Sequence, residues 1–127
     1  MITGFYAGLL AILYIVLIIN VIRKRMKFQI GIGDQNNHVL AKAIRVHANF
    51  AEHVPFAILL MALCDYNQTN AVYLHIMGVT LVIARIAHAY GLSKTSVRSI
   101  GRSIGVLGTM AVILFAAILL ILQFVTA

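Results

Sequence analysis

A polar stripe inside an apolar segment is the part of this sequence whose residue types could do chemistry. Arg45, Asn49 and Glu52 follow one another in steps of four and three residues, so a helix would hold them on one face, within about 60°. Apolar residues flank the stripe, and an ionised side chain in a membrane span costs on the order of 2.5–3.5 kcal/mol. Such a group persists where it meets a partner or a ligand, so the stripe is the first candidate binding site.

The stripe offers a guanidinium, an amide and a carboxylate. A guanidinium can bind a ligand carboxylate through two parallel hydrogen bonds, and the Glu52 carboxylate can bind an ammonium group. A small anionic zwitterion would satisfy both. The alternative is an internal ion pair between Arg45 and Glu52 that locks the bundle. Because these residues lie two helical turns apart, they could meet only through long side chains or across helices.

Composition places the chain in a membrane. Of its 127 residues, 62% are hydrophobic and 10% are charged, against about 45–50% apolar residues in soluble domains. The apolar run that begins at Ile2 has no basic region before it, so we expect a retained span rather than a cleaved signal peptide. The net charge of +7 could indicate nucleic acid, but so little solvated surface leaves no place for it, and we expect no nucleic-acid binding.

The hydropathy pattern predicts one all-α membrane domain over residues 1–127. Four apolar spans are expected, at about 2–22, 40–64, 71–90 and 103–125. The first has about 21 residues, or about 31 Å of helix, which crosses a bilayer core of about 30 Å. Short connections make neighbouring helices antiparallel, so the expected fold is an up-and-down four-helix bundle.

The basic residues predict the orientation of the bundle. They are Arg23, Lys24, Arg25, Lys27 and Lys42 around the first connector, Lys94, Arg98 and Arg102 around the third, and Arg45 and Arg85 near the same helix ends. The turn at residues 65–70 and both chain ends carry no Lys or Arg. The positive-inside rule therefore puts the basic connectors in the cytoplasm and both termini outside.

Other reactive residue types give weaker signals. Arg85 and His88 share one face of the third span, and Tyr90 follows as a ligand contact or an interfacial anchor. The five histidines contain no pair spaced by four residues, so we expect no metal site. The single cysteine, Cys64, lies at an apolar helix end without a neighbouring base, and is interpreted as a core residue.

The second span resembles a known family signature. The residues that carry the resemblance are Arg45-Val46-His47-Ala48-Asn49-Phe50-Ala51-Glu52-His53-Val54-Pro55. They are similar to the second-helix motif of the MAPEG family (membrane-associated proteins in eicosanoid and glutathione metabolism): Arg, three residues, Asn, two residues, Glu, and a Pro shortly after. Four spans, the chain length and the third-span sequence Arg85…His88-Ala89-Tyr90 extend the likeness over the whole chain. It resembles the small bacterial members and microsomal glutathione transferase.

The resemblance implies a homotrimer in a bacterial inner membrane, with glutathione bound between subunits near the cytosolic side. It implies the following roles. Arg45, Asn49 and Glu52 hold the glutathione backbone, Arg25 meets a carboxylate, Arg85 supports the site, His88 or Tyr90 lines it, and His53 stands where many members place a tyrosine. An arginine at the start of the fourth helix faces the sulfur, and Arg98 and Arg102 both compete for that position.

The implied chemistry is thiol activation. A thiol with a pKa of about 8.5 is only a few per cent ionised at neutral pH, and a guanidinium beside the sulfur favours the thiolate. The thiolate then attacks a lipophilic electrophile or reduces a hydroperoxide that arrives from membrane lipid, so the resemblance implies a glutathione-dependent transferase or peroxidase with glutathione as co-substrate.

Two other classes of function remain open at this point. Four short spans with one intramembrane glutamate also describe small proton-coupled multidrug transporters, in which Glu52 would exchange protons for cations. A fixed positive neighbour such as Arg45 argues against a cationic cargo. In a non-catalytic membrane scaffold, the polar stripe would only hold helices together.

Overall fold

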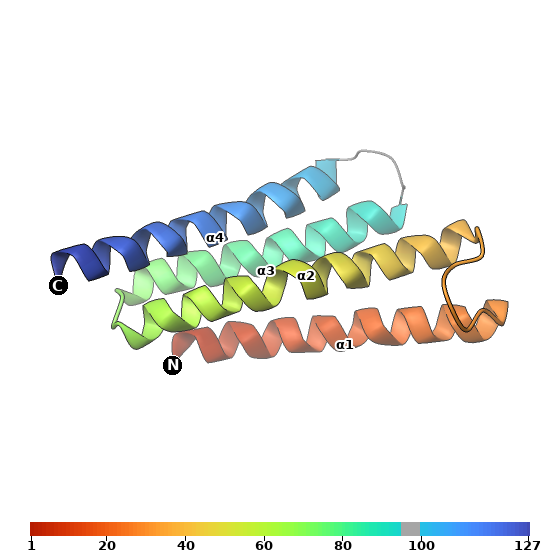
Figure 1. Ribbon diagram of the computed structural model, residues 1–127, viewed down its shortest axis with the longest axis horizontal. Coiled ribbons are helices and arrows are strands. Elements are labelled where there is room, and N and C mark those ends of the chain that lie inside the picture. The colour runs from red at the N-terminus through yellow and green to blue at the C-terminus, as the bar shows by residue number, and fades with distance from the viewer. Residues whose placement is uncertain (95–99) are drawn as a thin grey trace.

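The protein is four long helices laid side by side (Figure 1). The computed structural model describes the backbone of residues 1–94 and 100–127, and the side chains of 1–91 and 100–127. The helices are α1 (Ile2–Phe28), α2 (His38–Tyr66), α3 (Ala71–Lys94) and α4 (Ile100–Thr126). All four are long and apolar enough to cross a membrane. The prediction of an all-α protein with four membrane-capable helices is confirmed.

The helices run farther than the predicted spans at their basic ends. The sequence predicts a connector from residue 23, but α1 continues to Phe28 and ends at Gln29, whose φ of 56° closes the helix in the left-handed conformation. Hydropathy marks where a chain leaves the membrane, whereas Arg, Lys and Met are good helix formers that carry α1 beyond that point. The basic end of α1 is therefore a rigid helical turn, and its side chains have a fixed spacing.

The two middle helices position the candidate site. Both α2 and α3 contact three other helices, whereas α1 and α4 flank them and share no contact within the described ranges. Both termini and the α2–α3 turn lie at one end of the molecule (Figure 1). The α1–α2 connector, the last turns of α3 and the first turns of α4 lie at the other end, which we call the basic end (Figure 1). Side chains that project between α2, α3 and α4 near the basic end can thus meet.

The core is apolar and narrow, and the outward faces are apolar too. Buried residues from all four helices form one cluster that includes Leu10, Met61, Leu81 and Ala116. Large apolar side chains on every helix point away from this cluster and are exposed in the isolated chain. This outward apolar surface is what a lipid environment requires and what a water-soluble bundle lacks.

Small residues let α4 approach α3 closely. A Cβ added at Gly101 would lie 2.8 Å from the backbone oxygen of Ala87, and one at Gly105 would overlap the Cβ of His88. The similarly spaced Gly4 and Gly8 on α1 have nothing within 4 Å of an added Cβ. Of the two glycine pairs spaced by four residues, only the pair on α4 is thus a helix contact inside this chain.

Polar contacts tie the helices at the end that holds the termini. The backbone N–H of Thr3 donates to Asp65 Oδ2 at 2.7 Å, which joins α1 to the end of α2. The Tyr6 hydroxyl and His75 Nδ1 are 2.7 Å apart and join α1 to α3. These contacts hold three helices in register with one another.

Candidate binding site at the basic end

A hollow of about 180 Å³ lies between α2, α3 and α4 near the basic end. Polar and cationic side chains dominate its lining, which consists of His38, Ala41, Lys42, Arg45, Asn49, His88 and Arg102. Two residues of the predicted stripe, the predicted third-helix histidine and one of the two competing fourth-helix arginines therefore meet around one space. Three cations around one small space favour an anionic ligand.

Arg85 fixes the wall of this hollow from behind. Its side chain is only 2% exposed, and its Nη2 donates to Asn49 Oδ1 at 2.7 Å. The guanidinium also lies over the Phe50 ring, 5.7 Å from the ring centroid, and its Nη1 is 3.4 Å from Thr109 Oγ1 on α4. Arg85 thus links α3 to α2 and α4, and holds the Asn49 amide in one orientation.

His88 lies deeper in the hollow. The side chain is buried, and its Nδ1 has no hydrogen-bond partner among the described residues. An orphaned buried ring nitrogen is unusual, because leaving such a group unsatisfied costs about 1–3 kcal/mol. Gly105 on α4 packs directly against this side chain, so the α3–α4 contact and the depth of the hollow depend on the same residue.

Arg45 and Glu52 contact each other along α2. Arg45 Nη1 lies 3.7 Å from Glu52 Oε1, and the two side chains are 56% and 55% exposed. Long side chains thus bridge the two turns within one helix. An ion pair that is this long and this exposed contributes little to stability, at most about 1 kcal/mol, and it leaves both charged side chains partly exposed on the surface of the chain. The stripe is not closed off inside a sealed bundle.

Two other predicted ligand residues, His53 and Tyr90, do not line the polar hollow of the chain. The His53 ring nitrogen Nδ1 donates to the backbone oxygen of Asn49, one turn earlier, at 2.8 Å. Tyr90 is exposed and does not belong to the lining of the hollow. Among the described residues, no group of three His, Cys, Asp or Glu side chains could hold a metal ion.

Arg25 has a structural task in the connector after α1. Its Nη1 donates to the backbone oxygens of Ile30 at 3.2 Å and Gly33 at 2.8 Å. The φ of 65° at Gly33 is easily adopted by glycine and turns the chain back toward α2. Asn37 then caps α2 by accepting the N–H of Leu40 at 3.0 Å. Arg25 therefore shapes the connector that leads to the hollow.

Arg102 borders two different spaces. Besides the polar hollow, it lines a second hollow of about 390 Å³ on α4, together with Ser103, Val106 and Leu107. Val106 and Leu107 are exposed on the outer, lipid-type surface of the helix. A group held beside Arg102 can thus be approached from the polar side and from the apolar side. Arg98, the other predicted thiol-facing arginine, lies outside the described residues.

The sequence analysis missed His38 and Lys42 as lining residues. A signal for them exists, because steps of three and four residues back from Arg45 lead to Lys42 and then to His38. The polar face of α2 therefore begins at the first turn of the helix. In the sequence analysis, Lys42 serves only to predict the orientation of the chain in the membrane.

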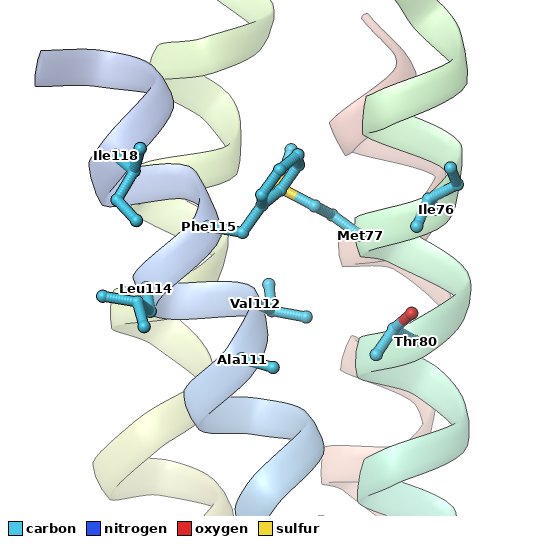
Figure 2. A pocket seen from close by; sticks show the side chains of 8 residues that line it. All are labelled: Ile76, Met77, Thr80, Ala111, Val112, Leu114, Phe115 and Ile118. Atoms are coloured by element: carbon cyan, nitrogen blue, oxygen red, sulfur yellow. The ribbon is translucent and has the colours of Figure 1, made fainter. Parts of the chain in front are cut away.

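An apolar groove of about 430 Å³ lies between α3 and α4, toward the end of the molecule that holds the termini (Figure 2). Met77 of α3 and Phe115 of α4 project into the space between the helices (Figure 2). Thr80, which lines the groove, precedes His88 by eight residues, or about 12 Å along α3. The groove thus lies farther from the basic end than the polar hollow.

Fold and site together define a four-helix membrane protein with a cation-lined hollow at one end. The sequence profile of the MAPEG family matches residues 3–122, and the chain belongs to this family. It is similar to the inner membrane protein YecN of Escherichia coli strain K12, with 36% identity over 91 residues, which cover 72% of this chain and 70% of YecN. YecN of Escherichia coli O6:H1 strain CFT073 matches with the same values. The family resemblance drawn from the second-helix motif is thereby confirmed.

Proposed function

We propose that this protein is a membrane-embedded, glutathione-dependent transferase or peroxidase. The observation that carries the proposal is the convergence of Arg45, Asn49, His88 and Arg102 on one hollow. Glutathione has two carboxylates and one ammonium group, and the site offers cations for the former and Glu52 for the latter. The chain belongs to the MAPEG family, and the resemblance of its second helix to the motif of that family implies the same ligand.

Four polar side chains of α2 can each be matched to a charged or polar group of the tripeptide. Lys42 and Arg45 supply the charge for its carboxylates. Asn49 uses its amide oxygen on Arg85, and its NH₂ group can donate to a ligand carbonyl. Glu52 is displaced from its long contact with Arg45 when an ammonium group offers a closer one.

Arg102 is the residue to which we assign thiol activation. Its guanidinium stabilises the thiolate, and its position between a polar and an apolar hollow is where a water-soluble thiol and a lipophilic molecule can meet. In the transferase reaction the thiolate sulfur forms a bond to an electrophilic carbon. Either a leaving group departs with the electron pair of its bond to that carbon, or the carbon is part of an activated double bond, whose π electrons move to the neighbouring atom and take up a proton. In the peroxidase reaction the sulfur attacks the terminal oxygen of the hydroperoxide, and the O–O bond breaks to give a sulfenic acid and an alkoxide, which takes up a proton and leaves as an alcohol. A second thiol then converts the sulfenic acid to a disulfide with loss of water.

The working unit is proposed to be a homotrimer. One subunit offers about 180 Å³, which is below the about 300–1,000 Å³ of small-molecule sites. Arg45 and Glu52 are half exposed although they lie within a membrane-capable helix. A neighbouring copy that covers them would complete the pocket and remove both charges from lipid.

We place the protein in a bacterial inner membrane with both termini outside. The name of the YecN relatives supports the membrane. The position of the ten Lys and Arg residues in the sequence, all in or beside the first and third connectors, supports the orientation. The hollow then faces the cytoplasm, where a soluble thiol is available.

Equilibrium binding of glutathione to the detergent-solubilised protein tests the proposal. Addition of glutathione is expected to produce the ultraviolet difference absorbance of a thiolate. The signal should be lost in Arg102→Ala, while Arg45→Ala should lose binding itself. His88→Ala should weaken binding, whereas the matched change at the other end of α3, His75→Ala, should not. Full binding and full signal in both arginine variants would refute the site.

The transporter alternative predicts a different signal. A proton-coupled exporter that uses Glu52 would release protons on addition of a lipophilic cation, and Glu52→Gln would abolish the release. The contact of Glu52 with Arg45 disfavours this function, because the site already holds a cation. A scaffold would show neither proton release nor a thiolate band.

A further inference from the structure

We propose that the basic end of α1 carries a binding site for the phosphate headgroup of an anionic phospholipid. The site, which we call the headgroup patch, consists of Asn20, Arg23, Lys24 and Lys27. These four side chains line a hollow of about 290 Å³. Within one chain it is separate from the hollow proposed to bind glutathione, because none of the residues that line that hollow belongs to α1.

Helical spacing gathers the headgroup patch on one face. Residues 20, 23, 24 and 27 stand in the i, i+3, i+4, i+7 relation, and all of them belong to the continuous helix α1. The next arginine along the helix, Arg25, turns to the other side and binds the connector. Three cations and one amide, carried by one continuous helix, therefore line a single space.

Among the described residues, no carboxylate forms an ion pair with the cations of the headgroup patch. The chain contains three acidic residues, Asp34, Glu52 and Asp65. Glu52 pairs with Arg45, and Asp65 accepts from Thr3 at the opposite end of the bundle. In the part of the chain that the structure describes, no ion pair engages a side chain of the headgroup patch. Three cations this close repel one another, and an external anion relieves that repulsion.

The surroundings of the headgroup patch select a lipid over a free phosphate ion. Ile19, Ile22 and Met26 stand one position before its members along the helix and are exposed apolar side chains. An occupant must therefore combine an anionic head with apolar chains. The patch also lies in the last turns of a membrane-capable helix, where we expect the phosphodiester groups of a bilayer.

Site-specific fluorescence quenching in vesicles tests this assignment. The chain contains no tryptophan, so Ile22→Trp introduces a single reporter beside the headgroup patch. The vesicles contain phosphatidylglycerol and phosphatidylcholine in equal amounts, and only one of the two lipids is brominated in each sample. Brominated phosphatidylglycerol is expected to bind beside this reporter at least fivefold more tightly than brominated phosphatidylcholine. One basic side chain contributes about 1 kcal/mol to the binding of an anionic lipid, which corresponds to about a fivefold change in the dissociation constant.

Three controls make the result specific. A reporter at the other end of α1, Phe5→Trp, should show no preference between the lipids. In the Ile22→Trp background, the triple change Arg23→Gln, Lys24→Gln and Lys27→Gln should lower the preference to within about twofold. The charge-preserving change Arg23→Lys, Lys24→Arg and Lys27→Arg should keep it.

The same preparation distinguishes the two sources of phosphate. Inorganic phosphate at matched ionic strength should leave the lipid preference unchanged. Loss of the preference in phosphate but not in chloride would reassign the patch to a soluble ion. Equal quenching by both lipids beside Ile22→Trp, or a preference that survives the triple glutamine change, would overturn the proposal.

Discussion

The substitution Gly105→Ala tests whether the close approach of α4 to α3 builds the candidate site. The new Cβ would lie 2.8 Å from the backbone oxygen of Ala84 and would overlap the Cβ of His88. Neither neighbour can rotate away, because one is backbone and the other is the first side-chain atom of a buried residue. The helix axes must therefore separate to accept the methyl group.

The matched control is Gly8→Ala on α1, where an added Cβ meets nothing within 4 Å. In both helices the change from glycine to alanine gains about 0.5–1 kcal/mol of helix stability. Only at position 105 does an overpacking cost of about 1–3 kcal/mol oppose this gain. The free energy of unfolding of Gly105→Ala should therefore fall below that of Gly8→Ala by about 1–3 kcal/mol.

The single cysteine provides the assay. Cys64 is fully buried in the folded chain, so a maleimide reagent reaches its thiol only when the bundle opens. Under conditions where closing is faster than labelling, the labelling rate follows the opening equilibrium. A difference of about 1–3 kcal/mol between the two variants corresponds to about 5- to 150-fold faster labelling of Gly105→Ala.

Glutathione binding should become weaker in Gly105→Ala, because separation of α4 from α3 moves Arg102 away from His88. Gly8→Ala should bind glutathione as the unchanged protein does. Equal labelling rates for the two alanine variants would show that α4 is free to adjust, and would refute the argument that Gly105 sets the depth of the hollow.

Three further predictions concern contacts in other parts of the bundle, each measured as a free energy of unfolding in detergent. A double-mutant cycle of Arg85→Met and Asn49→Ala should give a coupling energy of about 1–3 kcal/mol, because the two side chains are joined by a hydrogen bond of 2.7 Å. Additive effects of the two changes on the free energy of unfolding would contradict this prediction. Tyr6→Phe should cost about 1 kcal/mol by removing the contact with His75, and should cost nothing once His75 is alanine. Asn37→Ala should cost about 1 kcal/mol through loss of the α2 cap, whereas Asn37→Asp should be tolerated.

Local pattern and hydropathy sufficed for the helices and for one face of the site. The spans could be located because each is a long apolar run, and the stripe on α2 could be placed because helical spacing depends only on residue number. The same spacing contained Lys42 and His38, which an extension of the stripe toward the start of α2 would have found.

The pairing between helices could not be predicted from the sequence. Arg85 meets Asn49 because α3 packs against α2 with one particular rotation, and Gly105 lets α4 approach the His88 side of the same helix. The sequence likewise gave no sign that Arg25 binds its own connector, because a hydrogen bond to backbone carbonyls depends on how the loop folds. Interactions across helices depend on the packing of the whole bundle, which local spacing does not encode.

The buried guanidinium of Arg85 has a consequence for the lifetime of the protein. It is always charged, and within the described part of the chain no carboxylate pairs with it. The described residues of the chain therefore do not neutralise this buried charge, and an anion bound to the native state as proposed would act as its counter-charge. At a hundred times its dissociation constant, such a molecule adds about 2.7 kcal/mol to the folded state. Under the proposed function, the concentration of glutathione in the cell would help to determine how much of the protein stays folded, whether or not any reaction takes place.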